Sequence, residues 1–291
     1  MVRRRFHAMG TEIELLVDAA SVEGALDAAE QEFHRLETLL SRFREDSELS
    51  RLNREGSLEA GPDLRRVVEL ALAARARSGG RFDPTVHDAL VAAGYDRSFE
   101  LVPSESDTYP GLSMELDMDV HVQDSMDIHV EPDRIRLAPG VRIDLGGIGK
   151  GYAAERAAEI LATAGPCLVN AGGDVATRGG AWPVGVETSG DLLTLELSGS
   201  SGLATSGRDR RRWRRDGREL HHLIDPRTGA PAETNLLRVT VAASDAIEAE
   251  VAAKSLFLAG AEHAAAEADA AGLPAVLVTD DGRTVHAGGV A

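Results

Sequence analysis

The chain has 291 residues, of which 43% are hydrophobic and 27% charged, and this composition supports a folded core and excludes a wholly disordered chain. Its net charge of −17 opposes attraction to phosphate backbones, so we expect no nucleic-acid partner. We expect a cytoplasmic protein without membrane insertion, because the sequence contains neither a run of about 18 apolar residues nor the apolar stretch of a signal peptide.

The first part of the chain predicts a strand followed by two helices. Residues 11–17 alternate polar and apolar side chains, which is typical of a strand with one buried face. Apolar residues then recur at helical spacing over 25–40 and predict an amphipathic helix. Pro62 suits the first turn of a second helix, which is expected to stop at Gly79 and Gly80.

An acidic segment with several methionines covers 114–130, and its alternating apolar residues predict edge strands. A Pro-Asp turn at 132–133, followed by apolar residues within 135–137, predicts a hairpin. His121 and His129 lie in this segment among aspartates, so a metal site is an alternative interpretation. Strand alternation with polar residues facing solvent explains the same pattern.

The second half of the chain continues with mixed elements. A strand-like run at 141–145 leads through a glycine-rich turn into a helix over 152–164. A helix over 245–259, closed by Gly260, precedes a terminal hairpin over 274–282. Further strand-like segments lie at 168–169, 184–186, 192–197 and 239–242.

The order of these elements lacks the regular strand-helix alternation of a doubly wound parallel sheet, so the sequence predicts an α+β fold. Length allows one domain or two, and without a visible linker we expect a single domain over 1–291. The only cysteine, Cys167, lies in an apolar stretch and is expected to be buried and not catalytic. The basic cluster at 208–215 predicts a solvated hairpin, with an anion-binding or partner-binding surface as the alternative.

A glycine-rich turn at 144–152 (Asp-Leu-Gly-Gly-Ile-Gly-Lys-Gly-Tyr) joins a predicted strand to a predicted helix. Backbone N–H groups at the start of a helix favour an anion, and Lys150 adds a positive charge. The turn is therefore a candidate phosphate site, although a purely structural glycine turn explains the same residues. It matches neither the P-loop pattern nor Gly-x-Gly-x-x-Gly.

Seven motifs follow one another along almost the whole chain. They are Met-Gly-Thr at 9–11, the segment 41–53, Gly-Arg-Phe-Asp-Pro-Thr-Val at 80–86, the turn at 144–152, Asn-Ala-Gly-Gly-Asp at 170–174, Ala-Thr-Ser-Gly at 204–207, and His-Leu-Ile-Asp-Pro-Arg-Thr-Gly at 222–229. In this order they resemble the motifs of the FAD:protein FMN transferase (ApbE) family. Seven ordered motifs are hard to obtain by chance.

The resemblance implies a protein that binds FAD in a cleft between two α+β halves of one domain. It also implies a reaction in which FMN is transferred from FAD to a threonine or serine hydroxyl of an acceptor protein, and AMP leaves. Phe43 stands where the family usually has tyrosine, which preserves stacking and loses one hydroxyl. Carried over from the family, the residues expected around FAD are Met9, Phe43, Arg81, Phe82, Asp83, Asp144, Lys150, His222 and Leu223.

Two of these residues are also predicted to be catalytic. His222 is the candidate general base, because a hydroxyl that attacks phosphorus must lose a proton and imidazole titrates near neutrality. Lys150 is the second, since its charge lies at the candidate phosphate site. In a strand, His221 would point to the opposite face from His222. Asp225 is expected to brace the turn that follows it.

The family's magnesium ion is held by a backbone carbonyl of the glycine-rich turn, here Gly147, and by Asp and Thr side chains four residues apart. Glu250 and Lys254 stand at those two positions in this chain. Glutamate can ligate magnesium, but lysine offers donors only and repels a divalent cation, so a site without metal is favoured. Lys254 then replaces the ion and pairs with Glu250, whereas a solvent-facing Glu-Lys pair on the helix is the alternative.

Two functional hypotheses from different classes follow. The first is an enzyme that transfers FMN from FAD to a protein or, with water as the acceptor, an FAD pyrophosphatase. The second is a non-catalytic FAD-binding protein. Lys150 and His222 favour the first, and the altered metal positions favour the second.

Overall fold

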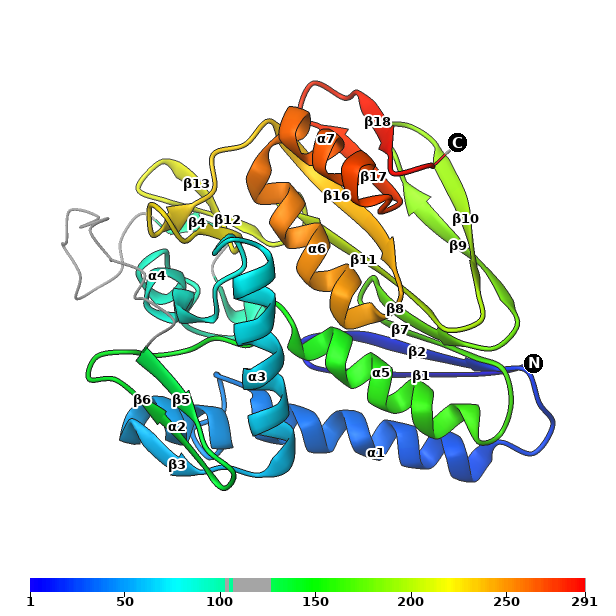
Figure 1. Ribbon diagram of the computed structural model, residues 1–291, viewed down its shortest axis with the longest axis horizontal. Coiled ribbons are helices and arrows are strands. Elements are labelled where there is room, and N and C mark those ends of the chain that lie inside the picture. Colours follow the sequence, from blue (N-terminus) through cyan, green and yellow to red (C-terminus); the bar gives the residue numbers. More distant parts are fainter. Residues whose placement is uncertain (103–104, 107–126, 291) are drawn as a thin grey trace. The chain divides into compact units, whose positions relative to one another are not determined.

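The computed structural model describes residues 1–102, 105–106 and 127–290. The chain divides into two units, each assembled from segments that are distant in the sequence (Figure 1). Unit 1 contains Met1–Thr38, Gly146–Ser206 and Thr234–Ala291, and unit 2 contains Leu39–Leu145 and Gly207–Glu233. Both units mix helices with strands, so the predicted α+β class is confirmed. No helix of the described ranges is long and apolar enough to cross a membrane.

Unit 1 is built on an eight-stranded sheet with the order β1-β2-β7-β8-β11-β16-β17-β18. Its strands are β1 (Val2–Ala8), β2 (Thr11–Val17), β7 (Cys167–Ala171), β8 (Asp174–Arg178), β11 (Ser201–Gly207), β16 (Leu236–Ala243), β17 (Ala275–Thr279) and β18 (Thr284–Ala287). Its helices are α1 (Glu23–Leu40), α5 (Gly149–Ala162), α6 (Ala246–Ala259) and α7 (Ala261–Ala271). A separate antiparallel hairpin is formed by β9 (Ala181–Glu187) and β10 (Leu192–Ser198).

The helices and this hairpin pack against opposite faces of the sheet, because successive side chains of a strand point to opposite faces. Phe6, Ile13 and Ala171 are directly opposite one another across β1, β2 and β7, so they share a face, and Phe6 packs edge-on against Phe33 of α1. Cys167 lies on the same face and donates to the carbonyl of Ala158 on α5. Helices α1 and α5 therefore cover one face of the sheet (Figure 1).

Alternate residues of the same strands point to the other face. There Leu168 and Val175 of the sheet form a core with Trp182 of β9 and Leu197 of β10. Burial raises the pKa of the Cys167 thiol to about 11 on the helix face, which agrees with the expected inert, buried cysteine.

Unit 2 consists of short helices and three small sheets. Its helices are α2 (Glu48–Glu55), α3 (Pro62–Arg77), η1 (Pro84–Val86), α4 (His87–Ala92) and η2 (Phe99–Leu101). Its strands are β3 (Ser57–Glu59), β4 (Glu105–Ser106), β5 (Ile128–Val130), β6 (Arg134–Leu137), β12 (Arg212–Arg215), β13 (Arg218–His221), β14 (Ile224–Asp225) and β15 (Ala230–Pro231). The basic cluster forms the expected hairpin, β12–β13, and buries Trp213, whose indole N–H donates to the carbonyl of Ala93.

Most of the predicted long elements are confirmed. They include the strand at 11–17, the helix over 25–40, the helix that starts at Pro62, the hairpin around 132–133, and the terminal hairpin β17–β18. Helix α6 begins at its Asp245 cap and ends at Gly260, as expected. The sequence missed β1, α2, α4, α7 and several short strands. Predictions for 114–126, including a metal role for His121, lie outside the described residues, and His129 is exposed on β5.

The strand predicted at 141–145 is wrong. The backbone N–H and carbonyl of Ile143 bond to the Asn53 side chain, each at 2.8 Å, and the N–H of Asp144 donates to the carbonyl of Pro84. The side-chain amide of Asn53 therefore makes the hydrogen bonds to the Ile143 backbone that a neighbouring strand would otherwise make. Helix α5 also begins at Gly149, three residues before the predicted start.

We expect the change Asn53→Ala to lower the free energy of unfolding by roughly 2–3 kcal/mol, because it leaves a buried donor and a buried acceptor of Ile143 without partners. Urea unfolding measures this loss. Asn53→Asp should fall between native and Asn53→Ala, since a carboxylate can accept from the N–H but cannot donate to the carbonyl. Equal stability of native and Asn53→Ala would contradict this role.

Candidate functional site

The predicted site residues are divided between the two units. Unit 1 holds Met9, Gly147, Lys150, Glu250 and Lys254. Unit 2 holds Phe43, Arg81, Phe82, Asp83, Asp144, His222 and Leu223.

Unit 1 contains a buried ion cluster formed by Lys150, Asp174 and Glu250, which we call the Lys150 cluster. The ammonium nitrogen of Lys150 lies 2.5 Å from Oδ2 of Asp174 and 2.6 Å from Oε1 of Glu250. The two carboxylate side chains are only 4% and 5% exposed. One ammonium thus bridges two buried carboxylates, which are contributed by β8 and α6. The sequence predicted site roles for Lys150 and Glu250 but none for Asp174.

A tight turn places Asp174 at the start of β8. Gly172 and Gly173, with φ of 65° and 104°, form this turn, and the N–H of Gly173 donates to the Asn170 side chain at 2.8 Å. A Cβ atom on Gly172 would lie 2.2 Å from the Thr11 hydroxyl, so only glycine fits there. The Asn-Ala-Gly-Gly-Asp motif therefore forms the turn that positions the Asp174 carboxylate.

Close packing of α5 on α6 places Glu250. The N–H of Gly151 donates to Oε2 of Glu250 at 2.9 Å, while Oε1 faces Lys150. A Cβ atom on Gly151 would lie 2.8 Å from the carbonyl oxygen of Ala246, so a larger residue would push the helices apart. Gly147 is buried in the turn just before α5.

Burial sets the protonation behaviour of Asp174. Its pKa is raised to about 6, because desolvation and the neighbouring carboxylate of Glu250 outweigh the lowering effect of the ammonium groups of Lys150 and Lys254. Lys254 lies one turn after Glu250 on α6, is half-buried, and therefore acts on the same cluster.

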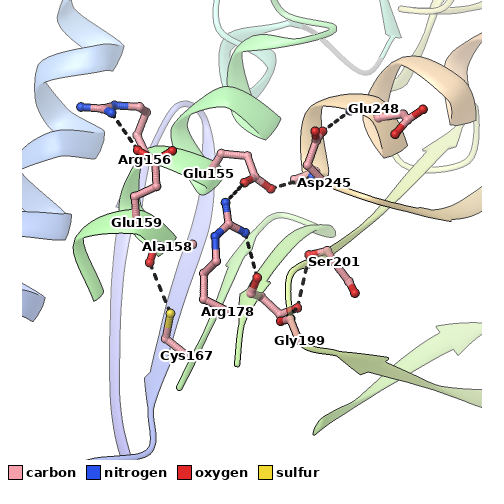
Figure 2. A network of polar contacts seen from close by, with 12 residues as sticks. Glu155, Arg156, Ala158, Glu159, Cys167, Arg178, Gly199, Ser201, Asp245 and Glu248 are labelled. Atoms are coloured by element: carbon pink, nitrogen blue, oxygen red, sulfur yellow. Dashed lines mark hydrogen bonds and ion pairs between the residues drawn. The ribbon is translucent and has the colours of Figure 1, made fainter. Parts of the chain in front are cut away.

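A second buried network fixes the start of α6 (Figure 2). Glu155 of α5 accepts the N–H of Ala246, the first residue of α6, at 2.7 Å and pairs with Arg178 of β8. Asp245 caps the same helix by accepting the N–H of Glu248 at 2.7 Å. Because Glu250 follows one turn later, this network fixes the position from which Glu250 reaches Lys150.

The residues at the family's metal position do not fit a divalent cation. Both oxygens of Glu250 already accept hydrogen bonds, from Lys150 and from Gly151. Lys254 contributes only a positive charge there. Across the described ranges, no group of three or more His, Cys, Asp or Glu side chains is arranged to hold a metal ion. A magnesium ion would therefore have to displace the Lys150 ammonium from the Glu250 carboxylate.

Met9 lies at the two-residue turn between β1 and β2, and it has a left-handed backbone. Met9 and Gly10 have φ of 54° and 67°, the values of a type I′ turn, in which the first position favours asparagine or glycine. The N–H of Met9 donates to Glu37 at 2.8 Å. A methionine at this position costs about 1 kcal/mol in backbone strain.

In unit 2, Phe43 belongs to an arginine-aromatic cluster that the sequence did not predict. The guanidinium of Arg42 lies 4.2 Å from the ring centroid of Phe43 and 4.6 Å from that of Tyr95. Its Nε lies 2.7 Å from Asp144, so the carboxylate that begins the glycine-rich turn is held by Arg42. The only sequence signal for Arg42 was its place inside the motif at 41–53.

The Phe-Asp-Pro-Thr motif is largely structural in its described contacts. Asp83 caps η1 by accepting from the N–H and hydroxyl of Thr85, at 2.8 and 2.7 Å, and it lies 2.5 Å from Arg75. Phe82 is buried and Arg81 is half-buried. The Asp83 carboxylate is therefore committed to holding the segment that carries Arg81 and Phe82.

The two adjacent histidines have different surroundings. His221 is buried, its Nε2 lies 3.1 Å from the carbonyl of Ala232, and its Nδ1 accepts the N–H of Leu223 at 3.3 Å. Burial lowers the pKa of His221, so it is a neutral, structural residue. His222 is half-buried just beyond β13, with Nδ1 3.4 Å from the carbonyl of Arg211.

Asp225 and Leu223 belong to the turn that follows the histidines. Asp225 accepts hydrogen bonds from the backbone and the guanidinium of Arg227, which confirms its expected bracing role. These hydrogen bonds also lower the pKa of Asp225 against the opposing effect of burial. Leu223 is buried, and its carbonyl accepts the N–H of Ala232.

The chain is similar to known proteins over nearly its whole length. The model of the ApbE family matches residues 9–277. The FAD:protein FMN transferase of Treponema pallidum (strain Nichols) is 30% identical over 298 aligned residues, covering 94% of this chain and 82% of that protein. The enzyme of that name from Escherichia coli (strain K12) is 29% identical over 280 residues, covering 90% and 76%.

Solved structures show the same fold. The crystal structure of the ApbE protein from Thermotoga maritima has a TM-score of 0.86 at 25% identity and covers 98% of this chain and 96% of that one. The flavin transferase ApbE from Vibrio cholerae has a TM-score of 0.81 at 22% identity, with the same coverage.

We expect Arg178→Met to lower the free energy of unfolding by about 3–5 kcal/mol, because it leaves the buried Glu155 carboxylate without its partner. The double change Glu155→Gln with Arg178→Met should recover much of this loss, since no uncompensated charge remains and the amide oxygen can still accept from Ala246. Urea unfolding measures both. Arg156→Met removes a more exposed charge from α5, which pairs with Glu159 and Glu32; it serves as the control and should change stability less. A double variant as unstable as Arg178→Met would refute this explanation.

Proposed function

Because the chain belongs to the ApbE family, we propose that it is an FAD:protein FMN transferase. It splits the pyrophosphate of FAD, joins FMN to a threonine or serine hydroxyl of an acceptor protein, and releases AMP. The observation that carries this proposal is the match over residues 9–277, which spans all seven motifs, together with relatives that bear this name.

Features of unit 2 support flavin binding. Phe43 is 36% exposed although Arg42 and Tyr95 contact its ring, and an exposed aromatic residue is suited to stacking on a flavin. The Nη2 atom of Arg42 is buried and has no hydrogen-bond partner among the residues described. A buried donor of this kind fits a ligand rich in acceptors, such as FAD. The residues proposed for FAD in this unit also include Arg81, Phe82, Asp83, Asp144, His222 and Leu223.

In unit 1, Lys150 and Met9 are the residues proposed for FAD. Lys150 lies in the first turn of α5, where its ammonium and the helix dipole both favour an anion such as the pyrophosphate. Met9 is held in a strained conformation, and residues kept under strain are often functional. We propose that its thioether contacts the flavin or the adenine.

His222 is the proposed general base. A carbonyl oxygen can only accept, so the contact of Nδ1 with Arg211 requires the tautomer in which Nδ1 carries the proton. Nε2 is then unprotonated and can take the proton of the acceptor hydroxyl as it attacks phosphorus. Lys150 is proposed to stabilise the charge that develops on the phosphate oxygens.

A non-catalytic FAD-binding protein, or an FAD pyrophosphatase, is the alternative. The observation that favours it is the poor fit of Glu250 and Lys254 to a divalent cation, because phosphoryl transfer usually gains from a Lewis acid. We also retain a cytoplasmic location and a single ApbE-like domain over 1–291 as parts of the proposal.

We expect the native protein to convert FAD and a threonine-bearing acceptor peptide into an FMN-modified peptide and AMP, detected by mass spectrometry and chromatography. His222→Ala should slow this transfer by roughly 10²–10⁴-fold, because the base that removes the proton of the acceptor hydroxyl is lost. His129→Ala, on the exposed face of β5, is the matched control. A His222→Ala variant as fast as native would exclude the base, and no transfer by any variant would favour the non-catalytic alternative.

We expect Met9→Asn to raise the free energy of unfolding by about 0.5–1 kcal/mol, because asparagine tolerates the left-handed turn. The same change should weaken FAD binding in a calorimetric titration, since it removes the proposed thioether contact. Met9→Leu, which keeps an apolar side chain and the strain, provides the comparison. A Met9→Asn protein with native FAD affinity would show that Met9 is not a ligand residue.

A further inference from the structure

Four ionisable side chains of unit 1 gather where α5, β8 and α6 meet. Lys150 bridges Asp174 and Glu250 at 2.5 and 2.6 Å. Lys254, one turn after Glu250, is half-buried, and its charge also acts on Asp174. Lys150 therefore contacts both carboxylates, and Lys254 lies on the face of α6 that carries Glu250, so the formal charges of the four groups cancel.

We propose that the ammonium groups of Lys150 and Lys254 form an internal cation site that takes the place of a divalent metal ion. The state without metal follows from contacts within unit 1. Its consequence, that the chain binds FAD without metal, rests on the proposed function.

Coordination chemistry argues against a metal ion in this cluster. The oxygens of Glu250 are used by Lys150 and by the backbone of Gly151, and one oxygen of Asp174 is used by Lys150. A divalent cation would have to displace the Lys150 ammonium and then remain close to both lysines. Adding two positive charges to a buried cluster that is already neutral carries a large electrostatic cost.

The same cluster holds a positive charge at the start of α5 without metal. The ammonium of Lys150 is supported by two carboxylates and stands in the first turn of α5, where the helix dipole adds positive potential. Gly151 keeps α6 close enough for Glu250 to hold that ammonium. The positive charge is therefore covalently attached and permanently positioned.

The first test measures whether divalent cations bind to the native protein in the absence of flavin. Thermal unfolding in magnesium and in chelator should give the same midpoint, and titration with Mn²⁺ followed by electron paramagnetic resonance should show no tight stoichiometric site. A midpoint that rises saturably with magnesium, or one Mn²⁺ bound per chain and displaced by magnesium, would overturn the proposal.

The second test removes the internal cation. Lys150→Met should lower the unfolding midpoint by roughly 6–15 °C, because two buried carboxylates lose their ammonium, and magnesium should restore part of that loss by binding those carboxylates. Lys150→Arg should stay indifferent to magnesium, since it keeps the charge. Arg156→Met, which removes an exposed charge from the same helix, should also stay indifferent. A Lys150→Met midpoint that magnesium does not raise would refute the cation role.

A further variant covers the case in which Lys150→Met does not fold. Glu250→Asp with Lys254→Thr shortens the carboxylate that holds Lys150 and removes the second ammonium, so it should gain a magnesium-dependent midpoint that the native protein lacks. A variant as indifferent to magnesium as native would show that Lys254 does not keep metal out.

FAD titration in chelator then tests the consequence for the ligand. Native affinity should be the same with and without magnesium, and a several-fold loss in chelator would overturn the inference. The metal measurements use neither FAD nor an acceptor. A protein that fails to transfer FMN but ignores magnesium would contradict only the proposed function, whereas a magnesium-binding transferase would contradict only this inference.

Discussion

The close approach of α5 and α6 at Gly151 is the constraint on which the chemistry of unit 1 depends. A side chain at this position would collide with the carbonyl of Ala246. Because the helices are in contact there, Glu155 can cap the start of α6 and Glu250 can reach both the backbone of Gly151 and the ammonium of Lys150. One missing Cβ atom therefore permits the whole arrangement of charges.

The burial of those charges contributes more to fixing one arrangement of the helices than to the free energy of unfolding. Moving three ionised groups out of water costs several kcal/mol each, and their mutual attraction repays this only with good geometry. The Lys150 cluster and the Glu155–Arg178 pair supply that geometry through short contacts, and they lie on the same two helices and on β8. Their main effect is to fix one register of α6 against α5, since other registers would leave buried charges unpaired.

Unit 2 uses the same principle with different chemistry. Arg42 joins the Phe43 and Tyr95 rings to the Asp144 carboxylate, and Asp83 caps η1 while pairing with Arg75. Residues proposed for FAD binding therefore also hold the fold. His221 and His222 differ in this respect, because the first is buried with both ring nitrogens on backbone groups, whereas the second, the proposed base, is half-buried.

The sequence by itself determined the fold class, the long helices and hairpins, and the family, because each depends on patterns of neighbouring residues. Examples are the apolar spacing over 25–40, the Asp245 and Gly260 ends of α6, and the motifs in a fixed order. Only the tertiary structure decided that Ile143 bonds to the Asn53 side chain and not to a neighbouring strand. It also decided that Arg42 holds Asp144 and that Lys150 bridges Asp174 and Glu250. These partners are far apart in the sequence, and no local pattern encodes which distant side chain will satisfy a buried polar group.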